Sequence, residues 1–380
     1  MSGWEESKCV APSFFSDDSA SVILSNADTY TKPGKKFVQQ HAFWKSLGNP
    51  RYVVAPMVEL SELAFRMLCR HFKADLTYTP MLHSIQFLNS AKYRDAHFDI
   101  HPSDHPIFAQ FCGNDPDVFA TVASLVHGHV EAIDINLGCP QGIAKRGHYG
   151  SFLLQQPDLI TRIVTTIKQS VSIPVTCKIR KVSDDLQQTV NLCYALEACG
   201  CDALCVHGRT KEEKAQQTKE FIANGGIETY SDAERCFAST RVDAVMSAEG
   251  ILDYPPLFTG NNSYDRLFIA EKYINHASLT LFFKIDSNSG DYILDFNVLL
   301  CFQPSCFFLF GFPPRSNGCI KAHLFRLLHG QLQSYPEIRT GLATATSLED
   351  CANTVDSLKR QSFAAVLPKW YRRYRQEDIC

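Results

Sequence analysis

Short apolar runs alternate with longer amphipathic segments along the middle of this chain, and this rhythm narrows the folds that it can adopt. Runs that are apolar throughout are typical of parallel strands buried on both faces, with helices between them. The runs are Tyr52–Ala55, Leu76–Thr79, Ile107–Phe111, Ala132–Ile135, Val175–Ile179, Ala203–Val206, Phe221–Ala223 and Ala244–Ser247. Eight such units over about 200 residues predict an α/β fold, a (β/α)8 TIM barrel at its lower size limit. An open doubly wound sheet is the structural alternative.

Polar residues lie at the last-but-one position of several of these runs or directly after them, near the point where each predicted strand ends. They include Gln110, Asn136, Lys178, His207 and Asn224. In a barrel these strand ends meet at one face, where catalytic groups lie. The sequence therefore predicts a functional site at the carboxyl ends of the strands.

The barrel is predicted to cover residues 36–258, between two other regions. Residues 1–35 are rich in Ser and Asp and are expected to form a disordered arm, and residues 259–380 a helical domain. Helices are predicted over Phe37–Leu47, Asp265–His276, Lys321–Gln333 and Ser347–Arg360.

An atypical apolar insert at about residues 278–314 interrupts the predicted helical domain. Its stretch Tyr292–Phe312 is almost long enough to cross a membrane. Asp295, Asn297 and Gln303 break the apolar run, so it is interpreted as non-spanning and no membrane partner is expected.

Overall charge excludes recognition of nucleic acid by a global basic field, because 37 Lys and Arg stand against 40 Asp and Glu. RNA contact therefore needs a local patch. Residues 369–375 (KWYRRYR) interleave basic and aromatic side chains, a pattern suited to phosphate contact and base stacking. A solvated helix end is the alternative interpretation.

The 15 cysteines indicate a reducing location, since their number is odd and no Cys-x-x-Cys pair occurs. No apolar stretch in Met1–Val10 could serve as a signal peptide. We therefore expect a protein of the cytoplasm, and also of the nucleus, with no metal site.

Three groups of residues could carry chemistry at the predicted strand ends. Cys139, in a Gly-Cys-Pro turn after a buried strand, could act as a nucleophile or general acid, or be a buried thiol in a loop. Lys178 interrupts an apolar strand and needs an anionic or electron-rich partner, of which an ion pair is the simplest. His207 and Arg209 follow the next strand directly, where a hydrogen-bonded structural histidine is the alternative.

Two glycine-containing turns follow the last two predicted strands, at Asn224-Gly225-Gly226 and at Ser247-Ala248-Glu249-Gly250. Glycine lets backbone N–H groups approach a phosphate, and barrels commonly bind phosphate in these two loops. A basic, glycine-punctuated loop at residues 144–150 could also bend over an anionic ligand, or be solvated.

Five blocks together resemble the tRNA-dihydrouridine synthases, in the same order along the chain. They are Ala55–Val58 (APMV), Gln110–Gly113 (QFCG), Asp134–Pro140 (DINLGCP), Val206–Thr210 (VHGRT) and Ala223–Gly226 (ANGG). The turn at Ser247–Gly250 is similar to that of the eukaryotic branch that modifies positions 16 and 17 of the tRNA D-loop. The resemblance covers residues 50–258 and, more weakly, Lys321–Gln333.

The resemblance implies an NAD(P)H-dependent flavin oxidoreductase that reduces uridine to 5,6-dihydrouridine in tRNA. NADPH would reduce a bound FMN, hydride would pass to C6 of the base, and Cys139 would donate a proton to C5. The residues expected to bind FMN are Pro56, Met57, Val58, Gln110, Lys178, His207, Asn224, Gly225, Gly226, Ala248 and Glu249. Those expected to contact the tRNA substrate are Asn136, Lys145, Arg146 and Arg209. We expect a monomer.

The crossover between the sixth and seventh predicted strands departs from the family pattern. These strands start 18 residues apart, at 203 and 221, which is less than any interval among the first six. Only Thr210–Glu220 is available for the helix between them, so that helix is expected to be vestigial. Two other functions therefore stay open: a tRNA-binding relic with weakened FMN binding, and an FMN barrel that acts on a free pyrimidine.

Overall fold

The computed structural model describes residues 42–212, 225–280, 283–285, 292–294 and 314–363. Residues Phe43–Cys380 form one compact unit, and the fold is described for this unit alone. The predicted arm lies outside the described residues. The predicted helix over Phe37–Leu47 enters them only at residue 42, and residues 42–46 are helical.

Seven of the eight predicted strands are confirmed, and the eighth, Phe221–Ala223, lies outside the described residues. A two-residue strand, β3, was not predicted. The strands are β1 (Tyr52–Val54), β2 (Thr77–Tyr78), β3 (Leu82–His83), β4 (Ile107–Cys112), β5 (Ala132–Leu137), β6 (Val175–Arg180), β7 (Ala203–His207) and β8 (Val245–Ser247).

These strands pair in parallel in barrel order, and the last one returns to the first. The chain of pairs runs β2–β4–β5–β6–β7, with β3 also on β4. A bridge from Val53 to Leu76 joins β1 to β2, and β1 pairs with β8. Because the first and last strands are hydrogen-bonded neighbours, the fold is the (β/α)8 TIM barrel and not an open doubly wound sheet.

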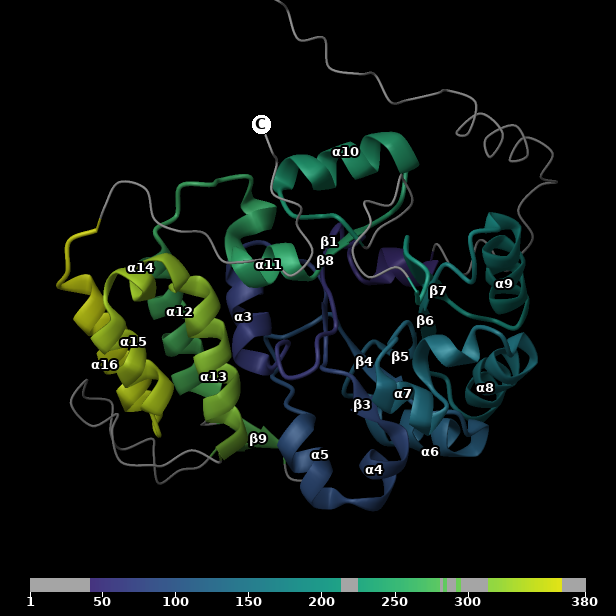
Figure 1. Ribbon diagram of the computed structural model, residues 1–380. Coiled ribbons are helices and arrows are strands. Elements are labelled where there is room, and N and C mark those ends of the chain that lie inside the picture. The colour runs from purple at the N-terminus through teal and green to yellow at the C-terminus, as the bar shows by residue number, and fades with distance from the viewer. Residues whose placement is uncertain (1–41, 213–224, 281–282, 286–291, 295–313, 364–380) are drawn as a thin grey trace, which may run out of the picture. The chain divides into compact units, whose positions relative to one another are not determined.

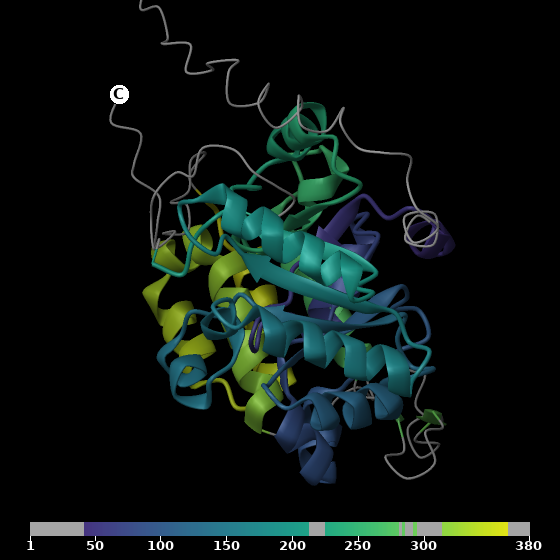
Figure 2. The same ribbon diagram turned by 90° about the vertical axis from the view of Figure 1, so that its right-hand side faces the viewer.

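Helices follow the strands and cover their outer side, as Figures 1 and 2 show for α6, α8 and α9 beside β4 to β7. The barrel helices are α3 (Leu63–His71), α4 (Ser84–Asn89), α5 (Ala91–His97), α6 (Pro116–Val126), α8 (Pro157–Ser170), α9 (Leu186–Ala198) and α10 (Tyr230–Thr240). Every residue of β4 and β5 is buried, which explains their uninterrupted apolar sequence.

The region after the barrel is helical, as predicted, and it packs on α3 (Figure 1). Its helices are α12 (Arg266–Thr280), α13 (Pro314–Leu327), α14 (His329–Ser334), α15 (Pro336–Thr344) and α16 (Leu348–Lys359). The prediction of one helix over Lys321–Gln333 is wrong, because the backbone breaks at Leu328 between α13 and α14. α15 was not predicted.

Within the apolar insert, the described residues form a small antiparallel pair, β9 (Phe283–Ile285) with β10 (Tyr292–Leu294). Most of the rest of Tyr292–Phe312 lies outside the described residues. In the part of the chain that the structure describes, no helix is both long and apolar enough to cross a membrane.

Candidate active site

The turn that carries Cys139 lies at the carboxyl end of β5, and two side chains hold it. The Asn136 carbonyl oxygen accepts hydrogen bonds from the backbone N–H of Gly138 at 3.2 Å and of Cys139 at 3.0 Å. On the other side, the backbone N–H and the hydroxyl of Ser151 donate to the Cys139 carbonyl at 3.1 and 3.0 Å. The thiol itself is free and partly exposed, so it can meet a substrate.

Gly150 explains why the chain can return so close to this turn. Its φ is +66°, and a Cβ atom there would lie 2.7 Å from the Cys139 carbonyl oxygen. Only glycine fits both restrictions. The predicted basic loop before it contains a short helix, α7 (Gly142–Gly147), and both Lys145 and Arg146 are exposed on it.

A buried chain of side-chain hydrogen bonds links this turn to the barrel interior. The Asn136 amide N–H donates to the Gln110 carbonyl oxygen at 2.8 Å. The Gln110 amide N–H donates to Asp134 at 2.8 Å, and the Thr176 hydroxyl donates to the other Asp134 oxygen at 2.6 Å. Burial raises the pKa of Asp134 to about 6. Gln110 keeps one amide hydrogen for a further acceptor.

Lys178 and His207 lie on the neighbouring strands, so the sequence-predicted polar residues of β4 to β7 come together. Lys178 pairs in register with Asn136 on one side and Cys205 on the other, and Arg180 pairs with His207. Burial lowers the pKa of Lys178. Burial, followed by the charges of Lys178, Arg180 and Arg209, lowers the pKa of His207 to about 2. His207 is therefore neutral near pH 7, beside a group of cations.

Arg180 was not predicted as a site residue, yet it ties two parts of the site together. Its Nε donates to the Gly138 carbonyl at 2.6 Å and its Nη1 to the Thr210 carbonyl at 3.1 Å. It thus joins the Cys139 turn to the segment after β7. The sequence signal was its place two residues after Lys178, on the same face of a strand.

The turn after β1 contributes the predicted residues Pro56, Met57 and Val58. Pro56 and Met57 are half-buried, whereas Val58 is 51% exposed. This turn is close to the end of β8, because the Ala55 N–H donates to the Ser247 carbonyl at 3.0 Å.

The late glycines adopt backbone conformations that favour glycine. Gly225 has a φ of +116°, and a Cβ atom there would lie 2.9 Å from the His207 ring. Gly226, with a φ of +73°, is exposed beside it, and Asn224 lies outside the described residues. Ala248 precedes α11 (Glu249–Asp253).

Glu249 does not present its side chain as a phosphate ligand. Its carboxylate pairs with Arg326 of α13 at 2.9 Å, so only its backbone could serve as a donor there.

These residues fit an anionic flavin nucleotide. The Nε atom of Arg209 is buried and has no hydrogen-bond partner among the described residues. The Lys178 amine, Arg180 and neutral His207 lie near it, and Gly225 lets the backbone approach the histidine ring closely. A ring system with a phosphate supplies the negative charge and the acceptors that this group of side chains calls for. Among the described residues, no cluster of three or more His, Cys, Asp and Glu could hold a metal ion.

Comparison with known proteins decides the family. Residues 53–281 match the family model for dihydrouridine synthase (Dus). The chain belongs to the dihydrouridine synthase family. This match includes every described barrel strand except Tyr52, the first residue of β1, and it continues through the whole of α12.

Curated relatives extend the similarity of this dihydrouridine synthase chain. A mouse protein named tRNA-dihydrouridine(16/17) synthase [NAD(P)(+)]-like is 40% identical over 341 residues, covering 85% of this chain and 64% of its own. The Saccharomyces cerevisiae tRNA-dihydrouridine(16/17) synthase [NAD(P)(+)] is 38% identical over 319 residues, covering 78% and 70%. A human tRNA-dihydrouridine(20a/20b) synthase [NAD(P)+]-like is 40% identical over 224 residues, covering 55% and 70%. The chain thus spans 64% to 70% of the length of these relatives.

Proposed function

We propose that this protein reduces uridine to 5,6-dihydrouridine in the tRNA D-loop, with FMN as cofactor and NADPH as reductant. The observation that carries the proposal is the free, partly exposed Cys139 thiol, which Asn136 and Ser151 hold at the carboxyl end of β5. It lies on the same barrel face as the Lys178, His207 and Arg209 group that fits a flavin nucleotide.

Some of the site's side chains would bind the cofactor, and others would act on the uracil base. Bound FMN would supply hydride, which it takes from NADPH. The buried Lys178 amine can donate hydrogen bonds to the polar edge of the ring, and neutral His207 can contact the ring without adding charge. Cys139 holds a proton at its Sγ for C5 of the base and can recover it from solvent, because it is partly exposed. The exposed Lys145 and Arg146 would contact the RNA, whereas Arg209, also expected to do so, has a buried Nε that suits the flavin nucleotide.

Positions 16 and 17 are the proposed targets. The relatives named for these positions match over 78% to 85% of this chain, whereas the human relative named for positions 20a and 20b matches over 55% at the same identity as the mouse one. The added similarity thus lies outside the shared 224 residues. We further propose a monomer in the cytoplasm and nucleus, where the thiols stay reduced.

The full-length chain, purified and examined by visible absorbance, tests this proposal. We expect a yellow protein that releases FMN on denaturation and that forms dihydrouridine in unmodified tRNA when NADPH is added. A colourless protein that still shifts tRNA in a gel would contradict it and would identify a tRNA-binding relic. Reduction of free uridine or uracil in preference to tRNA would instead identify an enzyme of free pyrimidines.

A further inference from the structure

One buried hydroxyl holds the turn between β1 and α3, which carries Met57 and Val58. Ser61 is fully buried. Its oxygen accepts a hydrogen bond from the Met57 N–H at 3.0 Å, and its hydroxyl donates to the Met57 carbonyl at 3.1 Å. The Met57 carbonyl also accepts from the backbone N–H groups of Leu60 at 3.1 Å and of Ser61 at 3.2 Å, so the Ser61 side chain is needed above all to bind the Met57 N–H.

The turn needs this support because its backbone is unusual. Glu59, between Met57 and Ser61, has a φ of +59°, in the left-handed region that a non-glycine residue adopts only at a cost. Val58 is 51% exposed, so burial of its side chain does little to fix the turn. Hydrogen bonds at the base of the turn are what keep Met57 in place.

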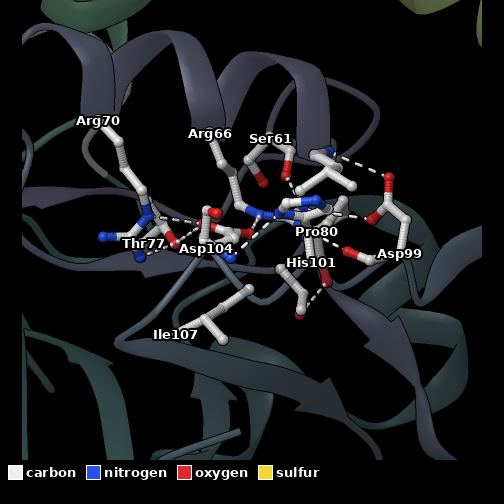
Figure 3. Close-up of polar contacts among 12 residues, drawn as sticks. Ser61, Arg66, Arg70, Thr77, Pro80, Asp99, His101, Asp104 and Ile107 are labelled. Atoms are coloured by element: carbon white, nitrogen blue, oxygen red, sulfur yellow. Dashed lines mark hydrogen bonds and ion pairs between the residues drawn. The ribbon is translucent and has the colours of Figure 1, made fainter. Parts of the chain in front are cut away.

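Ser61 is itself bonded to a buried polar cluster around Arg66 and Asp104, which Figure 3 shows. The Nη1 atom of Arg66 donates to the Ser61 carbonyl at 2.8 Å, and its Nε to Asp104 at 2.7 Å. Arg66 and Asp104 are both fully buried. Burial opposes the charge of Arg66, but Asp104 and Asp99 outweigh it and raise the pKa of the guanidinium.

The same buried polar cluster extends to β2, the next strand of the barrel. Arg70 donates from Nε to the other Asp104 oxygen at 2.7 Å, and from Nη2 to the Thr77 hydroxyl at 2.9 Å (Figure 3). The Thr77 hydroxyl in turn donates to Asp104 at 2.9 Å. Through these hydrogen bonds, Ser61 connects the turn that would face the proposed flavin to α3 and β2.

We propose that Ser61 is a positioning residue that sets Met57 against the flavin ring. The inference rests on the proposed function, since it takes Met57 as a contact of FMN. Ser61 does not touch the cofactor itself. Its hydroxyl oxygen keeps the Met57 N–H turned inward, so that the ring meets the side chain of Met57 and not a free N–H group.

The test compares FMN affinity of the full-length apoprotein, measured by quenching of FMN fluorescence, for wild type, Ser61→Ala and Ser170→Ala. Ser170 is a matched control, because its hydroxyl also donates to the carbonyl four residues earlier, at 2.8 Å, but on an exposed part of α8. We expect Ser61→Ala to weaken FMN affinity about tenfold and to shift the visible flavin band, and Ser170→Ala to do neither.

A second variant distinguishes loss of the Ser61 hydroxyl from a general effect of substitution on folding. Ser61→Thr keeps the hydroxyl, so its affinity should stay within about twofold of wild type. The inference is overturned if Ser61→Ala binds FMN as wild type does, if Ser170→Ala weakens binding equally, or if Ser61→Thr fails as badly as Ser61→Ala. Wild-type protein without FMN affinity would overturn the proposed function together with it.

Discussion

At the scale of single residues, the orientation of two buried amides decides what faces Cys139. A carboxylate only accepts hydrogen bonds, so ionised Asp134 turns the N–H side of the Gln110 amide toward itself. The Gln110 oxygen then faces Asn136, whose own oxygen is left for the N–H groups of the Cys139 turn. A carboxyl group in the barrel interior thereby helps to position the thiol.

We predict that Cys139→Ala retains FMN and NADPH oxidation but nearly abolishes dihydrouridine formation. In the proposed reaction the thiol acts on the base, and reduction of the flavin does not require it. Visible absorbance, NADPH consumption and dihydrouridine content of tRNA check the three parts. Cys205→Ala, on β7, two strands away from β5, is the control and should keep forming product. Normal product yield from the Cys139 variant would refute the assignment.

The raised pKa of Asp134 predicts a pH dependence of stability. The folded-state pKa is about 6 against an ordinary value of 3.8, so ionisation of this carboxyl is harder in the folded protein. Stability is therefore lost as the pH rises between these two values, by about 3 kcal/mol in total. Relative to wild type, Asp134→Asn should become more stable over this range, as urea unfolding at several pH values would show.

Asp350→Asn gives a control of opposite sign for that experiment. Hydrogen bonds from Thr346 and Ser347 lower the pKa of the exposed Asp350 carboxyl. The contribution of Asp350 to stability is thus lost as the pH falls. The free energy of unfolding of the wild type should therefore increase relative to that of Asp350→Asn as the pH rises. A difference between wild type and Asp134→Asn that does not change with pH would contradict the burial argument.

The polar ends of the strands could be predicted because each is local to its own run of sequence. Cys139, Lys178 and His207 were found in this way. The roles of Ser61, Ser151 and Arg180 could not, because each depends on a partner that only the folded chain brings near, such as the Cys139 carbonyl for Ser151. Asp134 gave a usable signal, since a carboxylate within an apolar strand needs buried partners.

At the scale of elements, a small buried cluster fixes α3 to the C-terminal helices. Glu62 accepts a hydrogen bond from the Tyr273 hydroxyl of α12 at 2.6 Å and lies 3.1 Å from His323 Nε2 of α13. The His323 ring stacks on Phe65 with centroids 4.3 Å apart. Burial opposes ionisation of Glu62, but the charge and hydrogen bond of His323 outweigh it and lower its pKa.

We predict that His323→Ala lowers the free energy of unfolding by about 1–3 kcal/mol near neutral pH, because it removes a hydrogen-bond partner of the Glu62 carboxylate. The contribution of Glu62 is present above the ordinary pKa of 4.5 and is lost as the pH falls through its lower folded-state value. The difference from wild type should therefore shrink at acidic pH. Urea midpoints across pH measure it.

His323→Gln is the conservative control, because its amide can still donate to Glu62. It should recover part of the loss. Equal destabilisation by Ala and Gln would indicate that packing against Phe65, and not the bond to Glu62, is what His323 contributes.

Element boundaries were predictable where the periodic pattern is long and not where packing overrides it. The helices near Asp265–His276 and Ser347–Arg360 are present as α12 and α16. The only glycine near the break at Leu328 is Gly330, which lies inside α14, and Leu328 is fully buried at the corner between α13 and α14. β3 has two residues, too few to give a period.

At the scale of the whole barrel, one flank is covered less than the rest. β7 is half-buried at four of its five residues, although β4 and β5 are buried throughout. α9 exposes Leu186, Val190 and Tyr194, 39%, 39% and 44% respectively, at a spacing of four residues along one face. The helix expected after β7 would be the next one around the barrel from α9. Most of the expected vestigial helix, Thr210–Glu220, lies outside the described residues.

We predict that a family-length crossover grafted between β7 and Gly225 raises the melting temperature and the FMN occupancy. A full helix would cover the apolar face of α9, and each Å² removed from water contributes about 25 cal/mol. The same strand end carries His207, against which Gly225 packs, so a better-held β7 should also retain FMN more firmly. Val190→Gln supplies the internal check: it should cost little in this chain, where Val190 is exposed, and about 1–2 kcal/mol in the graft, where it would be buried. If the graft changes neither quantity and Val190→Gln is equally mild in both proteins, the exposed face of α9 is harmless and the short crossover does not limit FMN binding or stability.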